Sequence, residues 1–504
     1  VAPIWDVIAI DAFLERAGPI AVHERFVNPS IQLIDPSGPN PRPVYVVARG
    51  VDLAKAADSG ATVDWESVHA GDFAASQGVL VLDATRASPS GLPLFVASLS
   101  RVDSAVEEVM DLRLPSDRWY FGPNMTDYAS VAATGPVLGI KPGGLFRRFA
   151  LAWVLQSPRI LSRSNVADAS RLVWERDVVG RLERYAPFLD FGNPYPVISG
   201  DRMRWFSVGY VSASAFPGVP TAEWRGDRVR YLHAGAVGVV DAITGETNVY
   251  AFREPDLVMQ GWIDLLPSLV QPFDAMSEAL AASIRYPVEL FDVQHDIVVS
   301  ATVLDTGPAQ ADRVSAFYEP TWWVGPALGD SLVRLRRVAV DEVGTPPVVR
   351  HVLVGTVGRD GPALSIVGVD STVQMLGPTQ LARRFIPLRD ATADFHGGMR
   401  AVPLSDGLVV LQASYRIPTE DGAALELRGV TLARGSAVGS GTTLAEAIER
   451  LGSDVPAPVR SGSWAEARRW FQRLDAARQS GDWRAFGEAY DALRRLFVPV
   501  DSLP

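Results

Sequence analysis

The clearest helical pattern in the first half of the chain lies between residues 143 and 198. One set of apolar residues recurs there at three- and four-residue steps: Leu145, Phe146, Phe149, Trp153 and Val154. This spacing predicts a helix with one apolar face, which we expect to be buried. Pro158 and the polar residues 162–165 interrupt the pattern and offer N-cap oxygens for a second helix. We predict that this helix runs from Val166 to Tyr185 and ends before Pro187, so that the two helices form a hairpin docked on a sheet.

Short runs rich in Val, Phe and Tyr predict strands on both sides of this hairpin. The predicted strands cover residues 43–51, 78–82, 92–99, 119–122, 128–132, 204–212, 228–240, 247–252, 297–303, 314–318, 332–340, 348–357, 408–415 and 424–432. Residues 28–43 hold five prolines and are predicted as an extended loop, whereas Asp241–Gly245 is predicted as a tight hairpin turn. Helical patterns return at residues 103–112, 256–265, 274–284, 287–295 and 442–451.

The organisation that follows is a chain of five parts. A β-rich part covers residues 1–142, and the hairpin, the central strands and a second helical group cover 143–296. A second β-rich part covers 297–451, a linker with two prolines covers 452–463, and a pair of helices covers 464–504. The predicted fold class is α+β, with mostly antiparallel β-sheets, a central helical hairpin, a second helical group and a C-terminal helix pair.

Composition narrows the range of functions. The 504 residues carry a formal net charge of −11, and this charge argues against nucleic acid as a partner, since a polyanion needs a basic surface. No run approaches the roughly 18 apolar residues of a membrane-spanning helix, so we expect no transmembrane span in this chain. The absence of cysteine excludes disulfides, thiolate metal sites and cysteine nucleophiles. The start at Val-Ala-Pro, without Met, is compatible with removal of a signal peptide or a membrane anchor.

The sequence holds no catalytic motif that we can defend. The six histidines are scattered singly. Asp241 is expected to bond backbone N–H groups in its own turn, because a cation there would need several more oxygen ligands. Asp390, Asp394 and His396 lie close in sequence and would line an unrecognised site. The glycine-rich residues 435–441 fit neither standard phosphate-binding fingerprint and are predicted as a flexible turn. We therefore predict no cofactor and no metal.

Aromatic pairs are the best candidates for a binding surface. The candidates are Trp119, Tyr120, Trp322, Trp323 and, on the last helices, Trp483. Neighbouring residues of a strand point to opposite faces of the sheet, so one member of the Trp322-Trp323 pair belongs to the core and the other is a candidate for exposure. An exposed Trp indicates a docking or ligand surface. Burial of both under a neighbouring element is the alternative.

Motifs along most of the chain resemble the uncharacterised protein family 0182, which consists of large bacterial membrane proteins of unknown function. They are Gly91-Leu-Pro-Leu-Phe-Val, Tyr120-Phe-Gly, Gly144-Leu-Phe-Arg-Arg, Ser170-Arg-Leu, Arg176, Arg181, Ala186-Pro-Phe-Leu, Asn193-Pro-Tyr, Val239-Val-Asp-Ala-Ile-Thr-Gly, Ile284-Arg-Tyr-Pro-Val-Glu-Leu-Phe, Gly377-Pro-Thr-Gln-Leu and Ser480-Gly-Asp-Trp. The resemblance implies an extracytoplasmic region that follows a bundle of transmembrane helices, and so a periplasmic or cell-surface location. It also implies acidic residues at Asn193 and within the segment from Ala382 to Arg389, where this chain has none.

The leading functional hypothesis is a non-catalytic, extracytoplasmic binding or scaffold subunit that docks on a membrane-embedded protein complex. A first alternative is a module that binds envelope glycans or polymers through the aromatic pairs. A second alternative is a hydrolase with an unrecognised site, which predicts that carboxylates such as Asp390 and Asp394 converge in a cleft.

Overall fold

The computed structural model describes most of the chain. It covers residues 2–17, 24–34, 41–88, 91–98, 118–132, 137–200, 202–219, 221–306, 320–327, 330–343, 348–368, 378–388, 393–404, 407–417 and 425–452, with residues 470, 472–473, 476–477, 485–486 and 488–490 near the end. The chain divides into two compact units, Val1–Leu451 and Gly452–Pro504. The boundary between them falls where the predicted linker begins.

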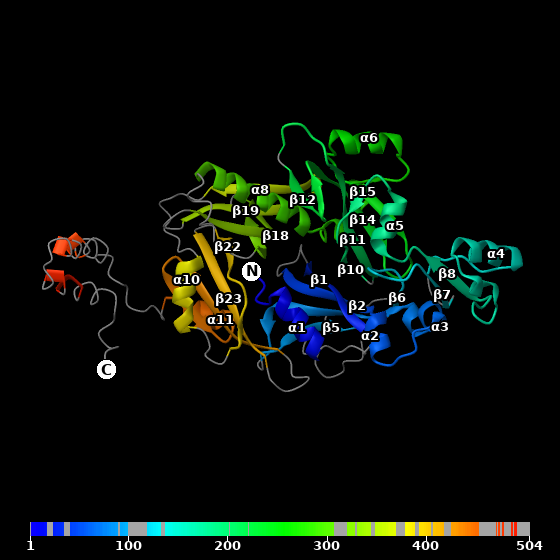
Figure 1. Ribbon diagram of the computed structural model, residues 1–504, viewed down its shortest axis with the longest axis horizontal. Coiled ribbons are helices and arrows are strands. Elements are labelled where there is room, and N and C mark those ends of the chain that lie inside the picture. The colour runs from blue at the N-terminus through cyan, green and yellow to red at the C-terminus, as the bar shows by residue number, and fades with distance from the viewer. Residues whose placement is uncertain are drawn as a thin grey trace. The chain divides into compact units, whose positions relative to one another are not determined.

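Four sheets carry most of the described part of the first unit (Figure 1). The first has the order β1-β2-β4-β5 and is antiparallel, with β1 at Glu24–Ile34, β2 at Arg42–Val51, β4 at Val79–Ala87 and β5 at Pro93–Ser98. The second has the order β10-β11-β14-β15-β16, with β10 at Tyr195–Ser199, β11 at Arg202–Ala213, β14 at Tyr231–Asp241, β15 at Thr247–Ala251 and β16 at Gln271–Pro272. Its pairs are antiparallel except β15–β16, and β9 (Asp190–Phe191) also pairs with β11.

The other two large sheets are antiparallel throughout their described strands. One is the meander β17-β18-β19-β20, at Thr321–Ala327, Asp330–Val343, Val348–Gly358 and Gly361–Gly368. The other is β21-β23-β24-β25, at Phe395–His396, Gly407–Arg416, Glu426–Arg434 and Ala437–Gly441, with β22 (Arg400–Leu404) also paired to β23. Two-stranded pairs are β3 (Ser76–Gln77) with β6 (Arg118–Trp119), β7 (Tyr128–Ala132) with β8 (Ser170–Trp174), and β12 (Ala222–Trp224) with β13 (Asp227–Val229).

Helices connect and cover these sheets. The α-helices are α1 (Val7–Ala17), α2 (Leu53–Asp58), α3 (Trp65–His69), α4 (Leu145–Val154), α5 (Val178–Tyr185), α6 (Leu257–Leu265), α7 (Glu278–Ala281), α8 (Val288–Thr306), α10 (Pro378–Phe385) and α11 (Leu444–Glu449). Short 3-10 turns are η1 (Asp72–Ala74), η2 (Pro158–Leu161), η3 (Phe273–Ala275) and η4 (Ile386–Leu388). The predicted α+β class with mostly antiparallel sheets is confirmed.

The second helix of the predicted hairpin is much shorter than predicted. Residues 170–174 form strand β8, which pairs with β7, and the helix α5 begins only at Val178. Glu175 has a positive φ of 49°, which no helix continues through, and the Asp177 carboxylate caps α5 by accepting from Gly180 N–H. Leu172 and Val173 therefore point to opposite faces of a strand, although the apolar pattern of this segment also fits a helix.

The segment Ile297–Val303, predicted as a strand, is instead the continuation of α8. Residues 288–306 contain neither Gly nor Pro. The β-branched residues in this run lower helix propensity by only a fraction of a kcal/mol each, so they do not end the helix. The predicted helix at 274–284 is broken into η3 and α7, and Ser277 caps the latter.

The proline-rich segment 28–43 is not a loop throughout, because β1 extends to Ile34 and β2 begins at Arg42. Its register against β2 shifts between Val27 and Ser30, so that Pro29, which has no N–H to donate, falls in the irregularity. The predicted turn Asp241–Gly245 is confirmed, since Gly245 N–H donates to Asp241 O at 2.9 Å. The predicted flexible turn at 435–441 is confirmed only for residues 435–436, because residues 437–441 form strand β25, which pairs with β24.

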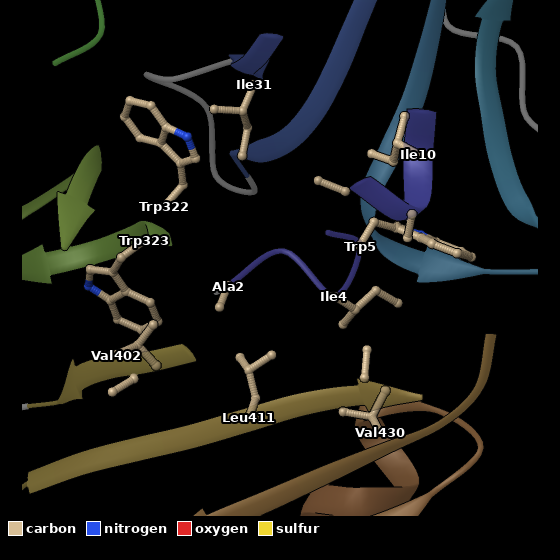
Figure 2. Packing of buried hydrophobic residues seen from close by; sticks show 14 of the residues in the cluster. Ala2, Ile4, Trp5, Ile10, Ile31, Trp322, Trp323, Val402, Leu411 and Val430 are labelled. Atoms are coloured by element: carbon tan, nitrogen blue, oxygen red, sulfur yellow. The ribbon is translucent and has the colours of Figure 1, made fainter. Parts of the chain in front are cut away.

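The largest hydrophobic core joins both ends of the first unit. Residues Ala2, Ile4, Trp5 and Ile10 pack with Ile31 of the first sheet, with Trp322 and Trp323 of β17 and with Val402, Leu411 and Val430 of the last sheet (Figure 2). A second core lies between the first two sheets and includes Trp119, Leu182 and Trp205. The two β-rich parts that the sequence separates therefore share one interior.

In the second unit the described residues are all helical. The guanidinium of Arg473 lies 4.8 Å from the ring centroid of Trp470 there. The predicted helix at 103–112, the predicted strand at 314–318, most of the predicted linker and Trp483 lie outside the described residues.

Candidate functional site

The first predicted helix, α4, carries its apolar face outward. The exposed fractions are 75% for Leu145, 86% for Phe146, 59% for Phe149, 70% for Trp153 and 71% for Val154. The prediction that this face is buried is therefore wrong, although the helix itself is confirmed. Figure 1 shows α4 beside the β7–β8 pair. We call Leu145, Phe146, Phe149 and Trp153 the α4 ridge, because on a helix of 3.6 residues per turn they occupy a single face.

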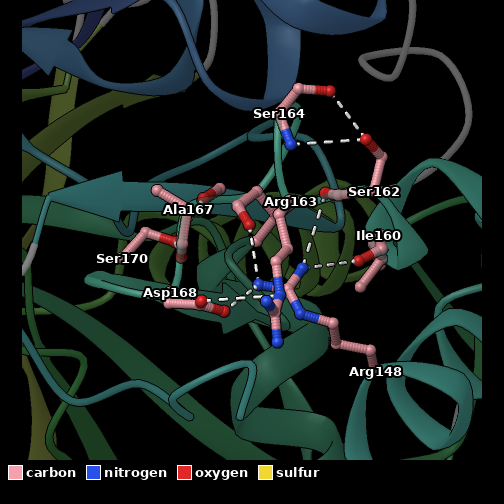
Figure 3. A network of polar contacts seen from close by, with 10 residues as sticks. Arg148, Ile160, Ser162, Arg163, Ser164, Ala167, Asp168 and Ser170 are labelled. Carbon is pink, nitrogen blue, oxygen red and sulfur yellow. Dashed lines mark hydrogen bonds and ion pairs between the residues drawn. The ribbon is translucent and has the colours of Figure 1, made fainter. Parts of the chain in front are cut away.

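Arg148 fixes this orientation from the other side of the helix. Its side chain is fully buried, and its guanidinium donates to the carbonyl oxygens of Ile160 at 2.9 Å and Val166 at 2.8 Å (Figure 3). It also donates to Asp168 Oδ1 at 2.7 Å, and this hydrogen bond holds the pKa of Asp168 below its usual value. A buried guanidinium with these partners prevents α4 from rolling over, because turning the ridge inward would break every one of these bonds.

A groove of about 540 Å3 runs along the flank of α4 next to the ridge. We call it the α4 groove. It is lined by Ile140, Lys141, Arg147, Ala150, Leu151, Val154, Leu155 and Trp174. Aliphatic and aromatic side chains dominate this lining, and two cationic side chains stand among them. A groove of this composition suits an apolar side chain or a helix of a partner.

The sequence stretch that contains α4 has a charge opposite in sign to that of the whole chain. Between Tyr128 and Ala167 the sequence holds five cationic residues, namely Lys141, Arg147, Arg148, Arg159 and Arg163, and no acidic residue. The first acid after this stretch is Asp168, which pairs with Arg148 and, at 3.5 Å, with Arg163. Lys141, Arg147 and Arg159 are exposed. This pattern is the sequence signal that could have pointed to the site, since it separates α4 from an ordinary core helix.

The predicted binding residues Trp322 and Trp323 are both buried, each 7% exposed. Figure 2 shows both within the largest core. Arg337, opposite Trp322 on β18, lies 5.3 Å from its ring centroid, and Arg285 lies 5.7 Å from it. Both faces of β17 are covered, so the expectation that one of the two tryptophans is exposed is wrong.

Trp119 and Tyr120 also expose little of their side chains to solvent. Trp119 is 3% exposed, donates from Nε1 to Gly78 O at 3.2 Å and meets the ring of Trp205 edge-on. Tyr120 is half-buried, and its N–H donates to Ala242 O. The structure does not bring these two residues together with Trp322 and Trp323, which belong to a different core.

The carboxylates singled out from the sequence have local partners. Asp241 is buried and accepts from the N–H groups of Ile243 at 3.0 Å and Thr244 at 2.8 Å, as predicted for its turn. Asp394 accepts from Ile417 N–H at 2.9 Å, and Nδ1 of His396 lies 2.9 Å from Ser414 Oγ. Asp390 lies outside the described residues, so its convergence with Asp394 stays a prediction.

In the portion of the chain that the structure describes, no group of three or more His, Asp or Glu side chains is arranged to hold a metal ion. Within the same portion, no helix combines the length and apolar character that crossing a bilayer requires.

The chain belongs to the uncharacterised protein family UPF0182, whose family model matches residues 37–306, more than half of the sequence. Its curated relatives are bacterial proteins that carry only the family name. A UPF0182 protein of Micrococcus luteus is 23% identical over 84% of this chain and 51% of its own length. One of Cupriavidus necator is 24% identical over 87% and 53%, and one of Geobacter sulfurreducens is 25% identical over 84% and 52%. The chain thus spans about half the length of these relatives. No solved structure matches it.

Proposed function

We propose that the protein is a non-catalytic, extracytoplasmic binding or scaffold subunit that docks on a membrane-embedded protein complex from the periplasmic or cell-surface side. The observation that carries this proposal is the α4 groove, which lies beside the outward apolar face of α4. Leaving four large apolar side chains of one helix face in water costs about 1.5–3 kcal/mol for each side chain, relative to burying it. Because buried Arg148 holds this face outward at that cost, we expect the face to be covered where the chain works at a membrane.

The α4 groove supports a protein as the docking partner. Its apolar lining includes Leu151, Leu155 and Trp174, which form a concave surface that a helix of a membrane protein can enter. The scattered histidines and the locally satisfied Asp241 and Asp394 favour binding over catalysis.

Site-specific cross-linking in the native host tests this proposal. A photo-reactive amino acid replaces Val154, which lines the α4 groove and is 71% exposed, and in a matched control it replaces Leu257 of α6, which is 92% exposed. We expect cross-links from position 154 to an integral membrane protein, and none from position 257. The proposal is wrong if position 154 gives no protein adduct while the untreated protein purifies alone from solubilised membranes.

A further inference from the structure

We infer that the α4 ridge lies in the headgroup layer of an anionic lipid surface, with Lys141, Arg147 and Arg159 directed to the lipid phosphates. This inference deepens the proposed function, because it assumes that the chain works at a membrane. It assigns the ridge to lipid, whereas the α4 groove remains the surface for a protein partner.

The ridge has the composition and geometry of an interfacial helix. Phe146, Phe149 and Trp153 project from one face of α4, and Leu145 begins it. Helices that lie in the plane of a membrane surface bury a face of Trp, Phe and Leu about 5–10 Å deep and keep cations at their margins. With ten residues α4 is about 15 Å long, which is half of a bilayer core, so the helix lies on the surface rather than across it.

Charge complementarity selects an anionic surface. The 40-residue acid-free stretch from Tyr128 to Ala167 brings five cations to the neighbourhood of α4 in a chain whose net charge is −11. Four of these cations, Lys141, Arg147, Arg159 and Arg163, are exposed, and Arg163 pairs with Asp168 at 3.5 Å. Cations beside a membrane-bound helix each strengthen attachment to anionic lipids, whereas an acidic surface would be repelled.

Helix α6 shows that exposed apolar residues alone do not meet these criteria. Its Leu257 and Leu265 are 92% and 67% exposed. Acidic residues surround them in sequence, since Asp256 caps the helix and Asp264 lies in its last turn. An anionic lipid surface would repel these carboxylates. Leu257 therefore offers a control position that matches the ridge in exposure and differs from it in charge environment.

Vesicle flotation of the whole purified chain tests the inference without any membrane protein. The probes are vesicles of phosphatidylglycerol mixed with phosphatidylethanolamine, and neutral vesicles of phosphatidylcholine. We expect the wild-type chain to float with the anionic vesicles and to bind the neutral ones roughly tenfold or more weakly. The double variant F149S/W153S should lose binding to anionic vesicles by at least about tenfold, and L257S should leave it unchanged.

Two further measurements keep the outcome clear. The double variant K141Q/R147Q should lose roughly tenfold in affinity for anionic vesicles and show a weaker dependence on salt. Thermal unfolding of each variant, monitored by circular dichroism, should match that of the wild type, because all substituted side chains are exposed. A wild-type chain that ignores anionic vesicles overturns the inference, and so does F149S/W153S binding that equals the wild type.

Failure of this inference differs from failure of the proposed function. If the wild-type chain ignores vesicles but position 154 cross-links to a membrane protein, the lipid assignment is wrong and the proposed function stands. If the chain binds anionic vesicles through the ridge but no cross-link to a membrane protein forms, the lipid assignment stands and the proposed protein partner is wrong.

Discussion

Asp6, just before α1, and Arg400, at the start of β22, form a buried ion pair, with 3.2 Å between Asp6 Oδ1 and Arg400 Nε. The same guanidinium donates to the carbonyl oxygens of Pro3 and Ile4, both at 3.0 Å. Tyr415 Oη donates to Ile4 O at 3.0 Å as well. The N-terminal segment is thus fastened to the last sheet by hydrogen bonds in addition to its apolar packing.

Replacing Arg400 by Met should reduce the free energy of unfolding by about 3–5 kcal/mol, because it leaves the Asp6 carboxylate buried and uncompensated. Burial already raises the pKa of Asp6 despite the opposing effect of Arg400, and loss of Arg400 raises it further. The loss of stability should therefore be smaller at acidic pH, where the Asp6 carboxyl is protonated. Urea unfolding at two pH values measures this, with R416M at an exposed position of β23 as the control. Equal stability of R400M and R416M would contradict it.

A second prediction concerns Arg148, whose buried guanidinium holds α4 in place. Arg148→Met should cost about 3 kcal/mol, since it removes the donors to the carbonyl oxygens of Ile160 and Val166. Arg147→Met, at the exposed neighbouring position, should change stability by less than about 0.5 kcal/mol. Hydrogen exchange should show faster exchange over residues 145–166 in R148M alone. Unchanged protection of these amides in R148M would show that the anchor does not hold the helix.

The pH dependence of stability should carry the signature of Asp11. Burial, and then the charge of Glu15, raise the pKa of Asp11 from 3.8 to about 6. Because the folded-state pKa is the higher one, this group contributes stability that is fully present below about pH 4 and is lost as the pH rises through about 6. Asp11→Asn should therefore stabilise the chain at pH 7 by about 1 kcal/mol, after allowance for solvent screening, and should have little effect at pH 4. Denaturant titrations at both pH values measure this. A larger gain at pH 4 than at pH 7 would reverse the sign and refute the assignment.

Gly245, at the end of the Asp241 turn, should tolerate no side chain. Its φ is +75°, and an added Cβ would come within 2.4 Å of the Phe121 ring. Gly245→Ala should cost about 2–4 kcal/mol, from the left-handed backbone and from overpacking together. Gly226, with a φ of +84° and no atom within 4 Å of an added Cβ, isolates the backbone contribution, and its Ala variant should cost about 1–2 kcal/mol. Thermal melts of the two variants give the difference, and equal costs would exclude a contribution from Phe121.

The burial of Trp322 bears on the glycan-binding alternative. Trp322→Ala should reduce stability by about 3–5 kcal/mol, because it empties a large volume of the main core. Trp174, which is 36% exposed and lines the α4 groove, provides the comparison, and Trp174→Ala should cost less than about 1 kcal/mol. A W322A chain that keeps its stability and loses only glycan capture would contradict this and would favour the glycan-binding hypothesis.

Local patterns predict the class and most strands of this fold. Residues 128–132, 204–212 and 348–357 are predicted as strands and are strands, because they are rich in β-branched and aromatic residues, which favour strands. The sequence predicts the wrong element type for residues 170–174 and 297–303, because short apolar runs fit the period of a helix and that of a strand. Pairing with β7 makes the first a strand, and continuation of α8 makes the second a helix.

The candidate site cannot be predicted from the sequence, for a different reason. Periodicity shows that α4 has an apolar face, but the direction of that face depends on Arg148 and on carbonyl groups up to 18 positions away. Likewise, the burial of Trp322 depends on Arg285, on Arg337 of β18 and on the rest of the main core, which local sequence does not specify. The charge of a whole segment, such as the acid-free stretch from Tyr128 to Ala167, is the readable signal that comes nearest to the site.

The shared interior of the two β-rich parts sets the order in which this chain can mature. Ile4, Trp5 and Ile10 complete their packing only after residues 402–430 have been synthesised, although the first sheet already offers them Ile31. Contacts between segments so distant in sequence are slow to form, and until they form the N-terminal residues remain accessible to chaperones and proteases. A ribosome-stalled or prematurely terminated chain that lacks β22–β24 should therefore be cleaved near Ile4, Trp5 and Ile10, whereas the completed protein keeps these three residues buried.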